Sequence, residues 1–220
     1  MTESLAAFQS RLGRALRGQA TCPINPDSQG YRFTMTVRRS WCEQRSIIAA
    51  RAILKLTPDG GKSLVQEYVD HGGGLAWFQA IESEKFLSFL SSRLPDPSHA
   101  LAICRMSQAL AHARRGSSIF KPPDLRVARG PIVHGSHAAL VWLYSDPGTV
   151  MAAMNAGHLP PLGPPSHAVL FAPGIPALFR EATELEVMLW NTLAITEAPP
   201  TLVDDLLREG VLMYRPDGSC

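Results

Sequence analysis

The stretch Thr183–Tyr214, TELEVMLWNTLAITEAPPTLVDDLLREGVLMY, has the pattern of two helices joined by a short turn. Thr183-x-x-Glu186 is a capping box, and it opens an apolar run at helical spacing. Thr201-x-x-Asp204 is a similar helix start, and Gly210 suits the left-handed residue that follows a helix end. Val211–Tyr214 indicates a closing strand. The stretch therefore predicts the order helix, turn, helix, strand.

Three strands are expected before this stretch. Leu125–Val133 and His137–Tyr144 are rich in β-branched and aromatic residues, and the Gly135-Ser136 pair between them predicts a tight hairpin. Residues 145–166 contain five prolines and three glycines, so they predict a long loop. His167–Phe171 is the third short strand. Residues 121–220 thus have the outline of a winged helix-turn-helix domain with a small antiparallel sheet.

The first 120 residues favour helices. Apolar residues at spacings of three and four, together with turn signals, predict helices over 3–17, 34–56, 63–70, 75–82, 84–94 and 98–114. The second helix is expected to bury one stripe, formed by Val37, Trp41, Ile48 and Ala52. The fold class predicted for the chain is α+β, with a helical domain at residues 1–120 and the winged helix-turn-helix domain at residues 121–220.

Composition and charge exclude several classes of protein. The 220 residues are 45% hydrophobic and 18% charged, which is enough apolar surface for a core and argues against disorder. No apolar run has the roughly 18–20 residues of a membrane span. Residues 1–120 carry 15 basic and 9 acidic residues, whereas residues 121–220 carry 6 and 10. This asymmetry supports a boundary near residue 120 and predicts different partners for the two parts.

The cysteines indicate neither a zinc ribbon nor a disulfide framework. The four of them, Cys22, Cys42, Cys104 and Cys220, form no C-x-x-C pair. The N-terminus has no apolar segment typical of a secretory signal, although residues 2–18 superficially resemble a mitochondrial presequence. We expect an ordinary first helix and a reducing, cytoplasmic location.

No self-sufficient active site is evident in the sequence. His134-x-x-His137 spans the predicted hairpin, and two histidines at that spacing could chelate a metal, but no third ligand stands nearby. Common nucleophile, zinc-protease and phosphate-loop motifs are absent. We therefore expect a non-catalytic chain with no metal or cofactor of its own. A stand-alone enzyme that uses His134 and His137 is the alternative.

The predicted helix-turn-helix could bind DNA or peptide. The candidate recognition helix, Thr201–Glu209, carries three acidic residues and one arginine, and such a helix is repelled by phosphates. A DNA-binding winged-helix regulator is therefore the second choice. A winged helix can instead pair a peptide with an edge strand. The predicted edge is His167–Phe171, with Val169 and Phe171 on one face, and Leu202 and Leu206 form the opposite wall. Core packing is the alternative role of these four side chains.

Several stretches resemble a known family. These are Tyr31-Arg-Phe-Thr-Met-Thr-Val-Arg-Arg-Ser-Trp41, Leu54-Lys-Leu-Thr57, His167-Ala-Val-Leu-Phe-Ala-Pro-Gly-Ile-Pro176, Arg180-Glu-Ala-Thr-Glu184 and Leu189-Trp190. They are similar to the MbnC-like and TglI-like accessory subunits of two-subunit, iron-dependent enzymes that modify ribosomally made (RiPP) precursor peptides. The 3-thiaglutamate pathway is the better match, ahead of methanobactin biosynthesis.

The resemblance implies a division of labour. The partner would be a TIM-barrel subunit with several iron ions, and this chain would hold the leader of the precursor peptide through a RiPP recognition element. The partner would then modify a cysteine oxidatively, by excision of the β-carbon of a C-terminal cysteine in the 3-thiaglutamate pathway. In that interpretation the basic segment before Leu56, with Arg38, Arg39 and Arg45, faces the partner subunit or the peptide.

Overall fold

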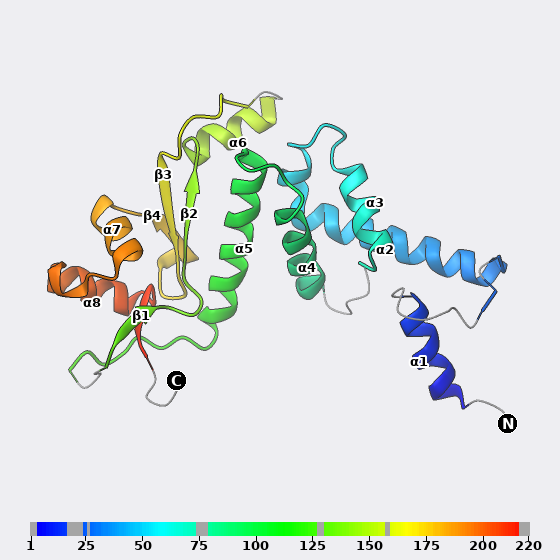
Figure 1. The fold of residues 1–220 in the computed structure, drawn as a ribbon, viewed down its shortest axis with the longest axis horizontal. Coiled ribbons are helices and arrows are strands. Elements are labelled where there is room, and N and C mark those ends of the chain that lie inside the picture. The colour runs from blue at the N-terminus through cyan, green and yellow to red at the C-terminus, as the bar shows by residue number, and fades with distance from the viewer. Residues whose placement is uncertain are drawn as a thin grey trace. The chain divides into compact units, whose positions relative to one another are not determined.

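The computed structural model describes residues 4–16, 24–25, 27–73, 79–126, 130–156 and 159–215. The chain forms two compact units, Met1–Leu94 and Pro95–Cys220 (Figure 1). The first unit contains helices α1 (Leu5–Leu16), α2 (Gln29–Leu54), α3 (Lys62–Asp70) and α4 (Gln79–Ser91). The second contains α5 (His99–Ser117), β1 (Ile132–His134), β2 (Ala139–Leu143), α6 (Pro147–Ala156), β3 (His167–Phe171), η1 (Pro176–Leu178), β4 (Phe179–Glu181), α7 (Glu184–Thr192), η2 (Ile195–Glu197), α8 (Pro200–Arg208) and β5 (Leu212–Tyr214).

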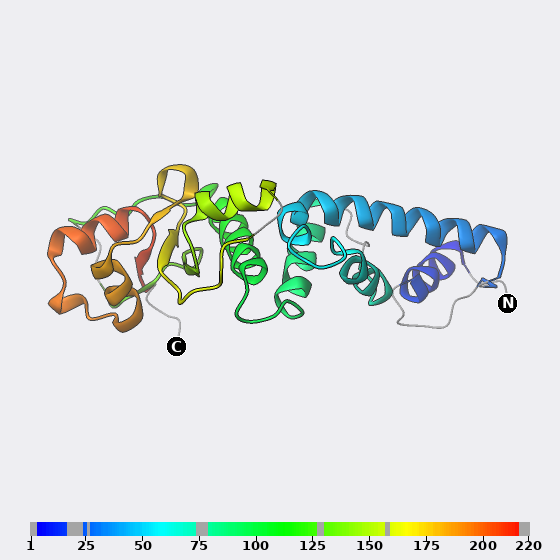
Figure 2. The ribbon, with the colours of Figure 1, turned by 90° about the horizontal axis from the view of Figure 1, so that it is seen from above.

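The core of the first unit lies at the C-terminal end of its long helix. The side chain of Ser28 caps the N-terminus of α2 by accepting from the Tyr31 N–H. α2 is the long blue helix in Figure 2. Its residue Ala50 leaves the helical conformation, and the last turn of the helix carries the buried residues Ile53 and Leu54. α3 and α4 pack against α2.

Most of α2 does not bury the stripe that its sequence predicts. Trp41 and Ile48 are 58% and 68% exposed, so the expectation that they face a core is wrong. Helical spacing of apolar residues identifies a face of a helix, but it does not say whether another element covers that face. The predicted helix 75–82 lies partly outside the described residues; its last four residues belong to α4, together with most of the predicted helix 84–94.

The second unit contains a three-stranded antiparallel sheet in the order β2-β3-β4, with α5 against one face (Figure 1). Ser98 caps α5, as predicted for a helix that starts there. A core between the helix and the sheet is formed by Ala102, Ala109, Ala113, Val141, Leu143, Val169 and Phe171. Because α5 contributes to this core, the helix belongs to the second unit.

Because α5 belongs to the second unit, the observed domain boundary differs from the predicted one. The sequence places the boundary at residue 120, whereas the structure divides the chain after Leu94. Charge and helix content shift near residue 120, yet the apolar face of α5 packs on the sheet that follows it. Packing, not local composition, assigns the helix to its unit.

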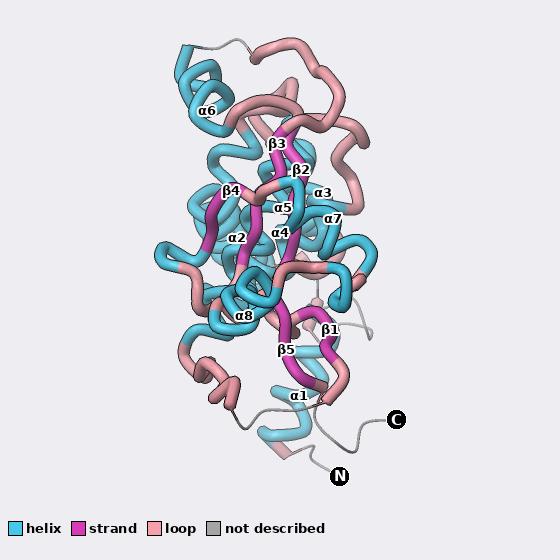
Figure 3. The backbone as a smooth tube through the Cα atoms, turned by 90° about the vertical axis from the view of Figure 1, so that its left-hand side faces the viewer, coloured by secondary structure: helices cyan, strands magenta, loops and turns pink. Residues whose placement is uncertain are grey.

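The two helices predicted for this stretch are present as α7 and α8, with the short helix η2 between them, and β5 pairs with β1 (Figure 3). Thr183 and Glu186 form the predicted capping box at α7. At α8 the cap is not the predicted Thr201, because the helix already begins at Pro200. Around Leu189 and Leu206, these elements enclose a second core, made of Leu170, Ala172, Ile175, Leu189, Ala198, Val203, Leu206, Leu207, Val211 and Leu212.

Two local predictions before β3 are wrong. Gly135-Ser136 does not connect a hairpin, because β1 pairs with β5 and β2 pairs with β3 in a separate sheet (Figure 3). The predicted loop 145–166 contains α6, whose first residue is Pro147. Proline is well tolerated in the first turn of a helix, so here it marks a helix start instead of a break. The observed architecture is mixed α and β, with two small antiparallel sheets.

Among the helices of the described residues, none combines the length and the hydropathy that crossing a lipid bilayer requires.

Candidate functional site

β3 is the central strand of its sheet. It pairs with β2 through Val169–Val141 and with β4 through Val169–Glu181. The expectation that His167–Phe171 forms a sheet edge is therefore wrong. Val169 and Phe171 are 5% and 1% exposed and belong to the core under α5. The sequence could not show this, because β4 follows a short 3-10 turn and has only three residues.

The two leucines predicted for the opposite wall also serve packing. Leu206 is 2% exposed in the core around α7 and α8, and Leu202 is half-buried against the same core. The four predicted peptide-binding residues, Val169, Phe171, Leu202 and Leu206, therefore line no common open groove. Their alternative role as core residues fits the observed burial.

The open edge of the sheet is β2. The Ala182 N–H donates to the Ala168 carbonyl, so the backbone N–H and C=O groups of Ala168 point toward β4. The backbone groups of the next residue, Val169, therefore point the other way, toward Val141 of β2. Backbone direction alternates along an antiparallel strand, so Leu140 and Trp142 point their N–H and C=O groups away from β3. Among the described residues, no strand pairs with this side of β2.

A groove of about 490 Å³ runs along this edge. One wall is α5, and the other is β2 with the residues that flank it. The lining residues are Arg105, Gln108, Ala109, His112, Ala138, Ala139, Leu140, Val141, Trp142 and Tyr144. The side chain of Trp142 is 40% exposed. An unpaired strand edge next to a helix wall is the geometry that accepts an extended peptide by backbone pairing.

Arg105 carries the one formal charge among the described residues that line the groove. It lies on α5 and forms an ion pair with Asp96 at 3.0 Å, while half of each side chain remains exposed. His112 adds a second nitrogen-bearing side chain, and none of the described lining residues is a carboxylate. The groove therefore favours an extended segment with acidic side chains.

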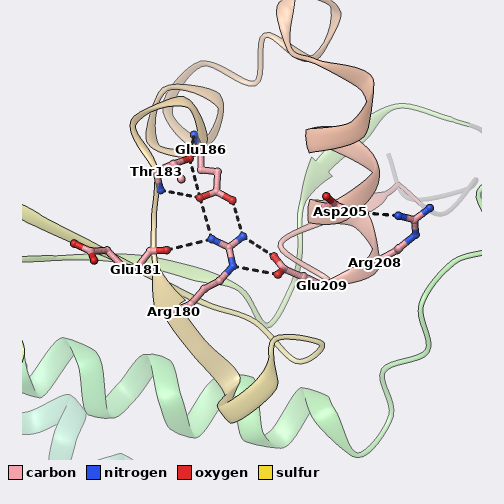
Figure 4. A network of polar contacts seen from close by, with 7 residues as sticks. All are labelled: Arg180, Glu181, Thr183, Glu186, Asp205, Arg208 and Glu209. Atoms are coloured by element: carbon pink, nitrogen blue, oxygen red, sulfur yellow. Dashed lines mark hydrogen bonds and ion pairs between the residues drawn. The ribbon is translucent and has the colours of Figure 1, made fainter.

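The other edge of the sheet, β4, is tied to the helix-turn-helix by Arg180 (Figure 4). Its guanidinium donates to both carboxylate oxygens of Glu186, at 2.5 and 2.9 Å, and to both of Glu209, at 2.7 and 3.1 Å. A fifth hydrogen bond, at 3.1 Å, goes to the Glu181 carbonyl. All five N–H donors of the guanidinium are thus used.

Glu186 is the buried member of this network, with 5% exposure. Burial alone would raise the pKa of Glu186, but hydrogen bonds from Arg180 and Thr183 outweigh it and hold the pKa below its ordinary value of 4.5. The same contacts raise the pKa of Arg180 further above its already high value. The network is a structural lock between β4, α7 and the end of α8.

The candidate chemical groups do not assemble into a catalytic or metal cluster in the described part of the chain. His134 stacks on Trp190 with ring centroids 4.1 Å apart, and its Nε2 lies 2.8 Å from the Trp190 carbonyl oxygen. His137 lies beside His112, with ring centroids 5.8 Å apart. The described residues contain no group of three potential metal ligands. Burial raises the pKa of the Cys104 thiol to about 11, which makes it a poor nucleophile.

The helix α8 carries two acidic residues, Asp204 and Asp205, and one basic residue. Arg208, the one basic residue of this helix, forms an ion pair with Asp205 at 3.1 Å (Figure 4). Glu209, directly after the helix, is paired with Arg180. A helix of this charge is poorly suited to enter a DNA groove.

The arginines predicted to face a partner lie on α2. Arg39 donates to Gln66 of α3 and lies 3.8 Å from Glu43, and Arg45 stacks over the Trp41 ring at 5.5 Å. The side chain of Arg38 lies outside the described residues. Their role in partner binding stays a prediction.

No protein-family model matches this chain, and no curated protein matches it. The groove along β2 is a feature that the sequence did not predict as a site. Its strand was predicted from the apolar residues of His137–Tyr144. That β2 is an edge, and that α5 lies beside it, depends on pairing between distant segments.

Proposed function

We propose that this chain is a peptide-binding accessory subunit that adds an extended peptide to the free edge of β2. The observation that carries the proposal is the outward backbone of Leu140 and Trp142 beside α5, with which no strand of the described residues pairs. Main-chain pairing supplies affinity in this mode, and pockets for alternate side chains supply specificity.

The family resemblance of the sequence supports the identity of the peptide and of the partner. In this proposal the peptide is a ribosomally made precursor, whose leader binds at β2. Its cysteine is presented to a TIM-barrel subunit with several iron ions, which modifies it oxidatively, as in 3-thiaglutamate biosynthesis. The iron ligands belong to that partner, and this chain is non-catalytic.

The arrangement of the second unit is compatible with a winged helix-turn-helix of the RiPP recognition element type. Two helices, α7 and α8, precede the closing strand β5, which pairs with β1 from the start of the sheet region; β2, α6, β3 and β4 lie between β1 and α7 in the chain. The proposed peptide site differs from the predicted one, because it lies on β2 and α5 and not on β3 and α8. The strands form two small sheets, β1-β5 and β2-β3-β4, where the prediction had a single small sheet.

Peptide selection followed by amide exchange tests the proposal. Linear peptides are selected from a random phage-displayed library on the purified full chain, and hydrogen exchange is then measured with the best peptide. We expect slower exchange at the Leu140 and Trp142 amides, because a paired strand would accept from them. The outward amides of Phe179 and Glu181 on β4 are the matched control and should not change. Failure to enrich any peptide, or protection confined to other amides, contradicts the proposal.

Co-expression tests the role in peptide modification. The chain is expressed with the products of its neighbouring genes, and the masses of short peptides are read by mass spectrometry. The proposal expects an oxidative mass change on a cysteine only when this chain and the iron subunit are both present. A modified peptide in the absence of this chain would contradict an essential accessory role.

The predicted docking surface on α2 has its own test. Reversing Arg38 and Arg39 to Glu should weaken co-purification with the iron subunit, because it replaces two positive charges of the basic segment with negative ones. Arg126→Glu is the control, since its side chain is 91% exposed in the other unit. Equal recovery of the partner with both variants would remove α2 from the interface.

A further inference from the structure

A second cavity of the same unit lies next to the end of the β2 groove. Its volume is about 400 Å³. Its walls come from the end of α5, from the connection between β1 and β2, from the end of α8 and from β5. The residues that matter for its chemistry are Phe120, Lys121, Ser136, His137 and Tyr214. This size and this mainly apolar lining are typical of a site for a small organic group.

The walls of the cavity are held close together. Gly210, at φ +73°, lets the Phe120 ring lie against the backbone, and a Cβ at this position would stand 2.6 Å from that ring. A Cβ at Gly116 would stand 2.6 Å from the side chain of His137. His137 is therefore seated against the last turn of α5 and has little room to move.

His137 has an unsatisfied atom in this place. Its Nδ1 is buried, and it has no hydrogen-bond partner among the described residues. Buried polar side-chain atoms normally have a partner, so this atom requires an explanation, and one explanation is a polar group that reaches it when the cavity is filled. Lys121 lies at the same cavity, and none of its described lining residues is a carboxylate.

The cavity and the groove are neighbours along the chain. His137 lines the cavity and Ala138 lines the groove. The rings of His137 and His112, one on each side of the junction, are 5.8 Å apart. Every strand pair of the described residues is antiparallel, and a peptide added to β2 in that direction would run from Leu143 toward Ala139. Its next residues would then reach the cavity.

We propose that this cavity is an anchor subsite for the peptide that binds β2, and this inference rests on the proposed function. It takes one large apolar or aromatic side chain, located just C-terminal to the paired segment. The backbone of the same residue satisfies His137 Nδ1, and Lys121 attracts an acidic residue at the mouth. The substrate class is thus an extended acidic segment followed by a large apolar residue.

A double-mutant comparison tests the subsite with the peptide selected on the full chain. Ser136 is exposed and lines the cavity, so Ser136→Trp should fill it without disturbing the core. We expect Ser136→Trp to weaken binding by about tenfold, the lower end of what burial of one large apolar side chain supplies. Replacing the anchor residue of the peptide with Ala should weaken binding by a similar factor, and the two changes together should weaken it no further. Thr201→Trp, exposed and outside both hollows, is the matched control.

The outcomes separate the subsite from the proposed function. If the peptide protects the Leu140 and Trp142 amides but Ser136→Trp changes its affinity less than about twofold, or the two changes multiply, the subsite is overturned and β2 pairing stands. If no selected peptide protects these amides, both proposals fail. A second measurement uses His137→Phe, which keeps the ring and removes Nδ1. A loss of about threefold or more supports the hydrogen bond, and unchanged affinity overturns that contact.

Discussion

The two edges of the sheet β2-β3-β4 differ in length, in charge and in how their backbone is used. β4 has three residues, and Arg180 binds it to α7 and α8 and occupies its outward Glu181 carbonyl. β2 has five residues, and its outward backbone faces a groove beside α5. Edge strands are usually shortened or blocked to prevent unwanted pairing. One edge follows that rule and the other does not, and this difference supports the proposal that a peptide adds to β2.

The largest effect on stability is expected when the Arg180 network at β4 is removed. Arg180→Met should lower the free energy of unfolding by about 3–5 kcal/mol, because Glu186 stays buried without its partner. The measurement is urea unfolding followed by circular dichroism. Arg208→Met is the matched control: its pair with Asp205 is exposed, and the expected loss is below about 1 kcal/mol. Equal losses in the two variants would show that the network at β4 is not a lock.

The same lock predicts a dependence of stability on acid. The pKa of Glu186 is lowered in the folded chain, so its contribution is complete above the unfolded value near 4.5 and is lost as the pH falls through the lower folded pKa. Glu186→Gln keeps the capping-box geometry but not the charge. Urea unfolding across that pH range should therefore show a shallower decline for this variant than for the natural chain. Parallel declines would indicate that other carboxylates dominate.

Proline substitutions in β2 and in β4 test which of the two edge strands pairs with the peptide. Trp142→Pro removes an outward N–H of β2, and we expect at least about a tenfold loss of peptide affinity, since one hydrogen bond and the close approach of the strand are lost together. Glu181→Pro removes an outward N–H of β4 and should leave affinity unchanged. Fluorescence anisotropy with the selected peptide measures both, and circular dichroism checks that both variants fold. If Glu181→Pro weakened peptide binding and Trp142→Pro did not, the peptide would pair with β4 and not with β2.

The smallest expected effect concerns the charge of the groove. Arg105→Gln should weaken binding of an acidic peptide by about two- to fivefold at low salt, with the difference shrinking as salt rises. Arg126→Gln, on an exposed side chain away from the groove, is the control. A salt-independent loss in the Arg105 variant would indicate a structural effect through its ion pair with Asp96.

Local signals predicted much of the second unit. The capping box at Thr183, the strand His167–Phe171 and the closing strand after Gly210 are confirmed. Each depends on neighbours within a few residues. The predicted binding residues Val169 and Phe171 were misplaced because the prediction lacked β4, whose pairing turns β3 from an edge into a central strand.

In the first unit too, local features of a helix were predicted better than its burial. The residues that end α2 were predicted well, since Thr57–Gly61 carries strong turn chemistry. The stripe with Trp41 and Ile48 was predicted to be buried, and both are exposed. Apolar periodicity is a property of one helix, whereas burial requires a second element at the right place.

The sequence by itself determined most of the helices and strands, the caps at Ser98 and Thr183 and the acidic character of α8, because these follow from backbone chemistry and from side chains close in the chain. Only the tertiary structure decided which strand is an edge, which unit holds α5, and that β2, α5 and the His137 cavity lie together. These depend on contacts between segments far apart in the sequence, where the alternatives differ in packing and in backbone pairing and not in local preference.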